Sequence, residues 1–147
     1  MTTPRIVTVA EGEALRPFGL QMRVLLAGHE CGDATSVLLA HHEPGIGPPP
    51  HYHGSQEECF FVIEGEYDVV VGDVSRRAGP GTFVFIPRNT VHTFKNAGAT
   101  TASMLDWSLP AGQDRYFRTV YQQQTVGSFA ATNMKALSSQ FDTYFPG

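Results

Sequence analysis

Short apolar and β-branched runs, separated by Gly, Pro and Asp, recur along most of the sequence. This pattern is typical of an all-β sandwich or barrel, because each group of turn residues ends one strand before the next begins. Turns are expected at Gly72-Asp73, at 79–81 and at 87–89. The chain is therefore predicted to be mainly β, with strands over 6–9, 22–27, 35–41, 59–64, 67–71, 82–86, 92–96 and 103–107.

The pattern changes after Pro110, where apolar residues recur at helical spacing. It predicts one helix over 114–123 and a second over 133–144, with Asn133 as the N-cap of the second. We expect both helices to pack on the outside of the β-domain, with their aromatic residues serving that packing. The 147 residues contain no linker segment, so the prediction is one domain, with a barrel over about 35–108 and a helical segment over about 110–147.

Composition excludes several classes of protein. A hydrophobic content of 41% with 16% charged residues is typical of a globular domain, and a net charge of −4 argues against a nucleic-acid partner. The basic pair Arg76-Arg77 is expected in a solvated turn. No apolar run has membrane-spanning length, and no signal peptide is visible. Cys31 and Cys59 are too few for a disulfide framework, which predicts reduced thiols in a cytoplasmic protein.

Two segments place metal-ligating side chains at suggestive spacings. His51 and His53 are two residues apart, so they share a face of an extended segment, and the stiff run Pro48-Pro49-Pro50 precedes them. A carboxylate follows, from either Glu57 or Glu58, since one residue of slip reverses the face. His92 begins a later strand. Three imidazoles and one carboxylate suit one divalent first-row ion such as Fe, Mn, Ni, Cu or Zn, with open coordination positions.

The remaining histidines, His29, His41 and His42, lie outside these spacings and can be accounted for as surface residues. Cys59 lies inside an apolar strand and is interpreted as a small core residue.

The two segments resemble the paired motifs of the cupin superfamily. The first motif, G-x5-H-x-H-x4-E-x6-G, is matched by Gly45, His51, His53, Glu58 and Gly65. The second, G-x5-P-x-G-x2-H-x3-N, is matched by Gly81, Pro87, His92 and Asn96. Asn89 stands where the family has glycine, and asparagine tolerates the left-handed backbone of a tight turn. The 15-residue spacer between the motifs is similar to that of small single-domain cupins labelled quercetin dioxygenase-like.

This resemblance implies a jelly-roll β-barrel with the metal inside its mouth. It implies His51, His53, Glu58 and His92 as the ligands, and thus selects Glu58 over Glu57. It also implies a homodimer.

An apolar pocket wall is expected from Phe60, Val62, Phe94 and Met104, with Phe83 or Phe85, and this wall suits a small organic molecule. Three functions are compatible with it. The first is a metal-dependent dioxygenase of a phenolic or enolic substrate, in which Glu58 is ligand and proton acceptor. The second is a metal-dependent lyase or isomerase with Asp106 or Tyr52 as the base. The third is a non-enzymatic binding module.

Overall fold

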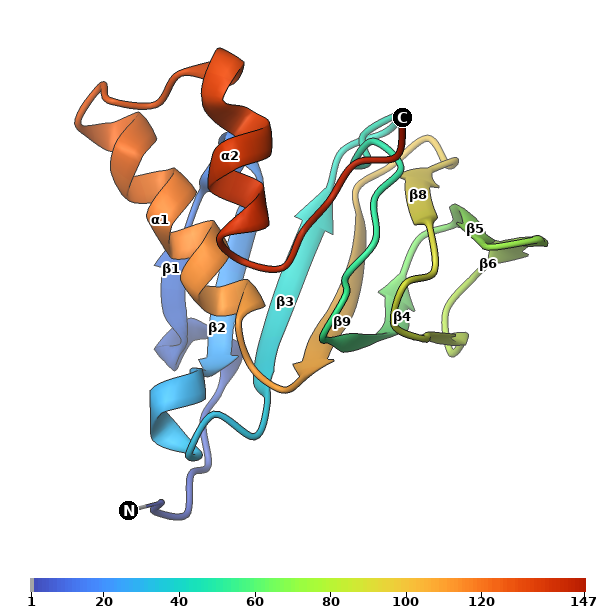
Figure 1. The fold of residues 1–147 in the computed structure, drawn as a ribbon. Coiled ribbons are helices and arrows are strands. Elements are labelled where there is room, and N and C mark those ends of the chain that lie inside the picture. Colours follow the sequence, from blue (N-terminus) through green and yellow to red (C-terminus); the bar gives the residue numbers. More distant parts are fainter. Residues whose placement is uncertain (1) are drawn as a thin grey trace.

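The computed structural model describes residues 2–147, and its strands form two antiparallel sheets (Figure 1). A six-stranded sheet has the order β1-β2-β3-β9-β4-β7, and a three-stranded sheet has the order β6-β5-β8. The strands are β1 (Glu13–Leu15), β2 (Gln21–Leu26), β3 (Ser36–His42), β4 (Glu57–Glu64), β5 (Tyr67–Val71), β6 (Val74–Ala78), β7 (Phe83–Ile86), β8 (His92–Asn96) and β9 (Ala102–Leu109). The mainly β, double-stranded β-helix architecture expected from the sequence is confirmed.

The two sheets enclose a core built from alternate residues of each strand. Register aligns Phe60 of β4 with Asp106 of β9, and Val62 with Met104, so these four side chains share the inner face. Tyr67 and Phe94 reach the same core from the three-stranded sheet. The inner face of the larger sheet therefore carries both the apolar core and the candidate polar residues.

Phe83 and Phe85 do not belong to this inner face, so the prediction that one of them lines the pocket is wrong. Phe83 pairs with Phe61, and Phe85 pairs with Cys59. These positions alternate with Phe60 and therefore point to the opposite side of the sheet. Phe83 is 56% exposed and Phe85 is 48% exposed.

Helix α1 (Gln113–Thr125) lies against β1 and β3, and helix α2 (Met134–Ser139) packs on α1, where Leu137 joins Tyr116 and Val120 in one buried cluster (Figure 1). Phe117 and Tyr121 of α1 pack against the buried cluster of β1, β2 and β3 that includes Met22 and Leu38, so the helix covers that end of the larger sheet. Both expected helices are present. Among residues 2–147, no helix has the length and apolar character that a membrane span requires.

Helix α2 ends earlier than the range 133–144 predicts. Asn133 precedes it at the N-cap position, as expected, although its side chain makes no capping hydrogen bond to a described residue. Asp142 adopts a positive φ of 56°, which a right-handed helix cannot contain. The chain beyond Ser139 therefore leaves the helix and turns back toward the barrel.

Seven of the eight expected strands are confirmed to within two residues at each end, as β2 to β5 and β7 to β9. The strand expected over 6–9 is wrong: Ile6 is 99% exposed, and Val9–Glu11 forms a 3-10 turn. Residues 6–9 therefore belong to neither sheet. The first strand is instead Glu13–Leu15, paired with β2.

Arg76 and Arg77 lie on β6 rather than in the expected turn. The turn that precedes β6 lies at Gly72-Asp73, and β6 pairs with β5 along its whole length. Arg77 donates from Nε to Oδ1 of its cross-strand partner Asp68 at 2.7 Å. Because β6 is an edge strand and all its residues except Ala78 are exposed, its composition resembles that of a loop.

Candidate metal centre

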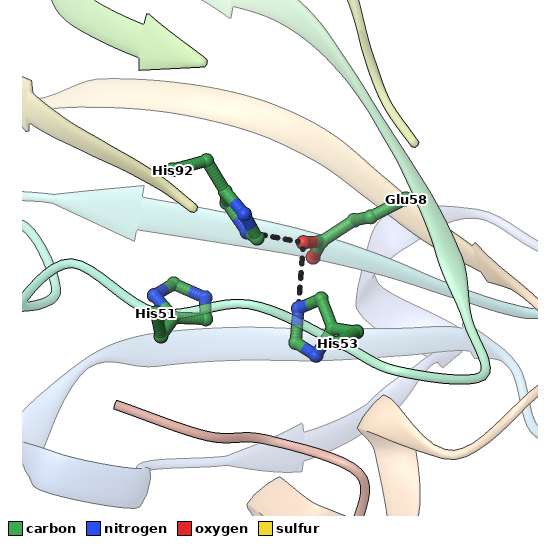
Figure 2. Close-up of side chains that lie close together, drawn as sticks. All are labelled: His51, His53, Glu58 and His92. Atoms are coloured by element: carbon green, nitrogen blue, oxygen red, sulfur yellow. Dashed lines mark hydrogen bonds and ion pairs between the residues drawn. The ribbon is translucent and has the colours of Figure 1, made fainter. Parts of the chain in front are cut away.

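Four side chains from the two sequence segments come together, as Figure 2 shows. One nitrogen or oxygen from each of His51, His53, Glu58 and His92 lies within 4.8 Å of all the others. These four side chains would hold a divalent ion, because imidazole nitrogens and a carboxylate oxygen are ligands that first-row metals accept. Glu57, the alternative carboxylate, is outside the group.

Backbone pairing brings the two segments into contact. His51 and His92 exchange both backbone hydrogen bonds, at 3.1 Å and 2.8 Å. Asn89 donates its N–H to the carbonyl oxygen of His53 at 2.7 Å. The φ of Asn89 is 60°, which confirms the left-handed turn expected where the family has glycine. The mismatched motif position thus still supports a candidate ligand.

Each of the three histidines uses Nδ1 to hydrogen-bond a backbone carbonyl. The acceptors are Pro49 for His51, Asp142 for His53 and Thr90 for His92, each at 2.9 Å. A carbonyl oxygen only accepts, so Nδ1 must carry the proton and Nε2 is left free in a neutral ring. This is the arrangement by which proteins orient metal-binding imidazoles.

The free Nε2 atoms converge on a carboxylate. Oε1 of Glu58 lies 3.2 Å from Nε2 of His53 and 3.1 Å from Nε2 of His92 (Figure 2). Neutral rings of this tautomer would turn lone pairs toward an acceptor, which is repulsive unless a cation lies between them. The donor set therefore fits a divalent metal, and in a metal-free protein protons would take that place.

The electrostatics of the group are consistent with this fit. Burial acts to raise the pKa of Glu58, but hydrogen bonds from His53 and His92 hold it well below its usual range. The pKa of His53 is raised, because its hydrogen bond and charge interaction with Glu58 outweigh the opposing effect of burial. Burial lowers the pKa of His51 to about 4, with His92 adding to the effect. An anionic carboxylate beside a neutral His51 ring favours a bound cation.

Asp142 is a supporting residue that local sequence patterns do not reveal. Its carboxylate accepts hydrogen bonds from the backbone N–H groups of Gly54, at 2.9 Å, and Ser55, at 2.7 Å, while its carbonyl holds His53. Next to it, Tyr144 pairs with Tyr52 through two backbone hydrogen bonds. The C-terminal segment thus fastens the loop that carries His53.

A cavity of about 470 Å³ extends from the histidine and glutamate group into the molecule. His51 and Glu58 border it, and its wall includes four of the expected pocket residues: Phe60, Phe94, Met104 and Asp106. Two expected residues lie elsewhere. Val62 is fully buried in the core between the sheets, and Tyr52 stacks on Tyr144 with ring centroids 5.4 Å apart.

Much of the cavity wall comes from parts of the chain that were not expected to contribute. Aromatic and methionine side chains from the chain before β3, from α1, and from α2 with the segment before it line the cavity, namely Phe18, Met22, Tyr116, Phe117, Phe129 and Met134. The expectation that the helix aromatics serve packing alone is therefore incomplete. Helical spacing reveals an apolar face, but it does not reveal that a cavity lies beneath that face.

Asp106 lies on the cavity wall close to Glu58. It is 8% exposed, and its buried Oδ1 has no hydrogen-bond partner among residues 2–147. Burial, together with the neighbouring Glu58 charge, raises the pKa of Asp106 well above its usual range. The two carboxyl groups therefore differ, because one is held as an anion and the other favours its protonated form.

A double-stranded β-helix with three histidines and a glutamate at its mouth defines a class of metal-binding barrel. The family described as Cupin domain matches residues 38–108. The chain belongs to the cupin superfamily.

Three relatives illustrate the range of similar proteins. Polyketide synthase CurC of Streptomyces cyaneus is 32% identical over 103 residues, which cover 69% of this chain and 67% of CurC. Quercetin 2,3-dioxygenase of Bacillus subtilis is 26% identical over 118 residues, covering 80% of this chain but only 34% of that enzyme. The structure of the polyketide cyclase RemF of Streptomyces resistomycificus has a TM-score of 0.61 at 24% identity, covering 73% of this chain and 80% of RemF.

Proposed function

We propose that this protein is a metal-dependent dioxygenase that acts on a small phenolic or enolic compound. The observation that carries the proposal is the position of the four-residue donor set at the border of a cavity of about 470 Å³. Apolar side chains dominate that wall, and the aromatic rings of Phe60 and Phe94 lie within it. Such a wall suits an aromatic ring, and the donor set suits an oxygen substituent on that ring.

Two of the relatives support the proposed substrate class. One relative is named quercetin 2,3-dioxygenase, and quercetin is a polyphenol with an enolic hydroxyl group. A second is named a polyketide synthase, and many polyketides are phenolic or enolic. Since this chain spans 34% of the first relative, the dioxygenase activity is our proposal and is not transferred from that protein.

The residues would divide the work in the following way. His51, His53, Glu58 and His92 would hold the metal, which when bound supplies Lewis acidity that lowers the pKa of a substrate hydroxyl. Glu58 would accept the hydroxyl proton, because its carboxylate is anionic and borders the cavity. The aromatic wall would orient the ring and exclude water from the charged end of the site.

The position of Asp106 favours a second candidate, a lyase or isomerase that uses the same metal without oxygen. A carboxyl group with an unpartnered buried Oδ1, on the cavity wall beside Glu58, stands where a substrate proton could be donated or removed. This candidate predicts turnover that does not consume oxygen and that is lost in Asp106→Asn.

The test begins with elemental analysis of the purified protein and continues with oxygen uptake in the presence of quercetin. We expect turnover in air, no turnover under anaerobic conditions, and loss of both metal and turnover in His92→Ala. His41→Ala, a histidine outside the donor set, is the matched control. Equal turnover with and without oxygen would reject the dioxygenase in favour of the second candidate. Binding of quercetin without any turnover would favour the non-enzymatic module.

A further inference from the structure

His42 is a buried residue of the cavity wall, although its sequence context can be accounted for by a surface position. It ends β3 and is 3% exposed. Its ring packs edge-on against Tyr67 and Phe94, with centroid distances of 5.6 Å and 5.0 Å. It does not belong to the group of candidate metal ligands, yet it borders the same cavity.

Tyr67 determines which nitrogen of His42 carries the proton. The Tyr67 side chain is fully buried, and Nδ1 of His42, at 2.8 Å, is the hydrogen-bond partner of its hydroxyl among the described residues. A buried hydroxyl proton left without an acceptor is costly, so the hydroxyl donates and Nδ1 accepts. Burial also lowers the pKa of His42 to about 4, with His41 adding to the effect, so the ring is neutral near pH 7. The single ring proton must therefore be on Nε2.

The Nε2–H group of His42 has no hydrogen-bond partner among residues 2–147. The side-chain amide of Gln113, another polar group of the wall, already donates to Oε1 of Gln56 at 3.0 Å. His42 thus offers an uncommitted donor in a mainly apolar wall. Among the described residues the fully buried polar side-chain atoms without a partner are Asp106 Oδ1 and Asp114 Oδ1, so Nε2 of His42 remains accessible, and a ligand or water can supply its acceptor.

We propose that His42 is a specificity-determining residue whose Nε2–H donates a hydrogen bond to an oxygen atom of the substrate. This inference rests on the proposed function and narrows its substrate class. The substrate is an aromatic compound that offers oxygen to the metal centre from one ring and an acceptor oxygen to His42 from a different ring.

The tautomer can be measured directly by ¹⁵N NMR of the zinc-loaded protein, because zinc is diamagnetic. We expect His42 near pH 7 to be neutral, with the proton on Nε2, and we expect Tyr67→Phe to shift the ring toward a mixture of tautomers. A proton on Nδ1, or a charged ring, would overturn the proposal whatever the protein binds.

Binding tests the specificity role under anaerobic conditions, with metal content matched between variants. The probes are quercetin and 3-hydroxyflavone, which share a ring system and the 3-hydroxy-4-carbonyl pair but differ in the hydroxyl groups of the outer rings. We expect His42→Met to weaken quercetin binding by about three- to tenfold and to change 3-hydroxyflavone binding by less than about twofold. His42→Gln, which keeps an N–H donor, should recover part of the loss, and His41→Met is the control.

The outcomes separate this inference from the proposed function. Equal losses for the two flavonols, or no loss in a folded His42→Met protein, would overturn the role of His42 as a specificity donor. If the unmodified protein binds neither flavonol, the proposed substrate class fails by itself, and the NMR measurement then decides whether His42 is a donor.

Discussion

His53 donates its Nδ1–H to the backbone carbonyl oxygen of Asp142 at 2.9 Å, across 89 positions of the sequence. The same aspartate accepts two backbone N–H groups, from Gly54 and Ser55, through its side chain. One residue near the C-terminus therefore holds both a candidate ligand ring and the loop on which it stands. Residues that orient metal ligands in this way contribute strongly to metal affinity.

Replacing Asp142 should loosen the metal centre without removing a ligand. Asp142→Ala deletes the acceptor for Gly54 and Ser55 and disfavours the φ of 56° at this position. We expect metal affinity to fall by about 10- to 100-fold. Competition with a chromophoric zinc chelator measures the change, and Asp73→Ala in the β5–β6 turn is the control. Unchanged affinity in Asp142→Ala would mean that the C-terminal segment does not support the site.

The backbone of Asn89 should decide the effect of substitutions there. At a φ of 60°, Asn89→Gly should leave stability nearly unchanged, because glycine adopts this conformation without strain. Asn89→Val should reduce the free energy of unfolding by about 1–2 kcal/mol. Urea denaturation of the metal-free protein measures both. Similar losses of unfolding free energy in the two variants would show that the asparagine side chain, and not the backbone conformation, determines stability at this position.

Filling the cavity should separate substrate binding from metal binding. Ala40 is buried on β3 and lines the cavity, so Ala40→Phe should project a ring into it. We expect roughly tenfold or greater loss of quercetin turnover with unchanged metal content. Ala136→Phe, on the exposed side of α2, is the control. Full activity in a folded Ala40→Phe protein would place the substrate outside this cavity.

The low pKa of His42 should make stability depend on pH. Because the folded-state pKa is about 4 and the ordinary value is 6.5, the unfolded chain binds an extra proton between these values. Stability should therefore decrease as pH falls from 6.5 toward 4, by up to about 3 kcal/mol from this group. Urea midpoints of metal-free protein across this range measure the effect, and His42→Gln should reduce the slope. An identical slope in His42→Gln would show that His42 is not a buried neutral ring.

Particular elements show how far sequence reasoning reaches. The spacing of His51, His53, Glu58 and His92 is local within two segments, and strand geometry alone left Glu57 and Glu58 as alternatives. Resemblance to the family selected Glu58, which the structure groups with the histidines. Strands with alternating apolar residues were found, whereas β1 and β6 were missed because edge strands are short or polar on their exposed sides.

The sequence by itself determined the β architecture, the turn at Asn89 and, through its resemblance to the family motifs, the set of candidate ligands, because strand alternation, turn conformation and motif spacing all act over a few residues. Only the tertiary structure decided that Asp142 supports His53, that α1 lines the cavity, and that His42 is buried against Tyr67. These contacts join residues that are far apart in the chain. Their energies come from packing and hydrogen bonding between elements, which no local pattern records.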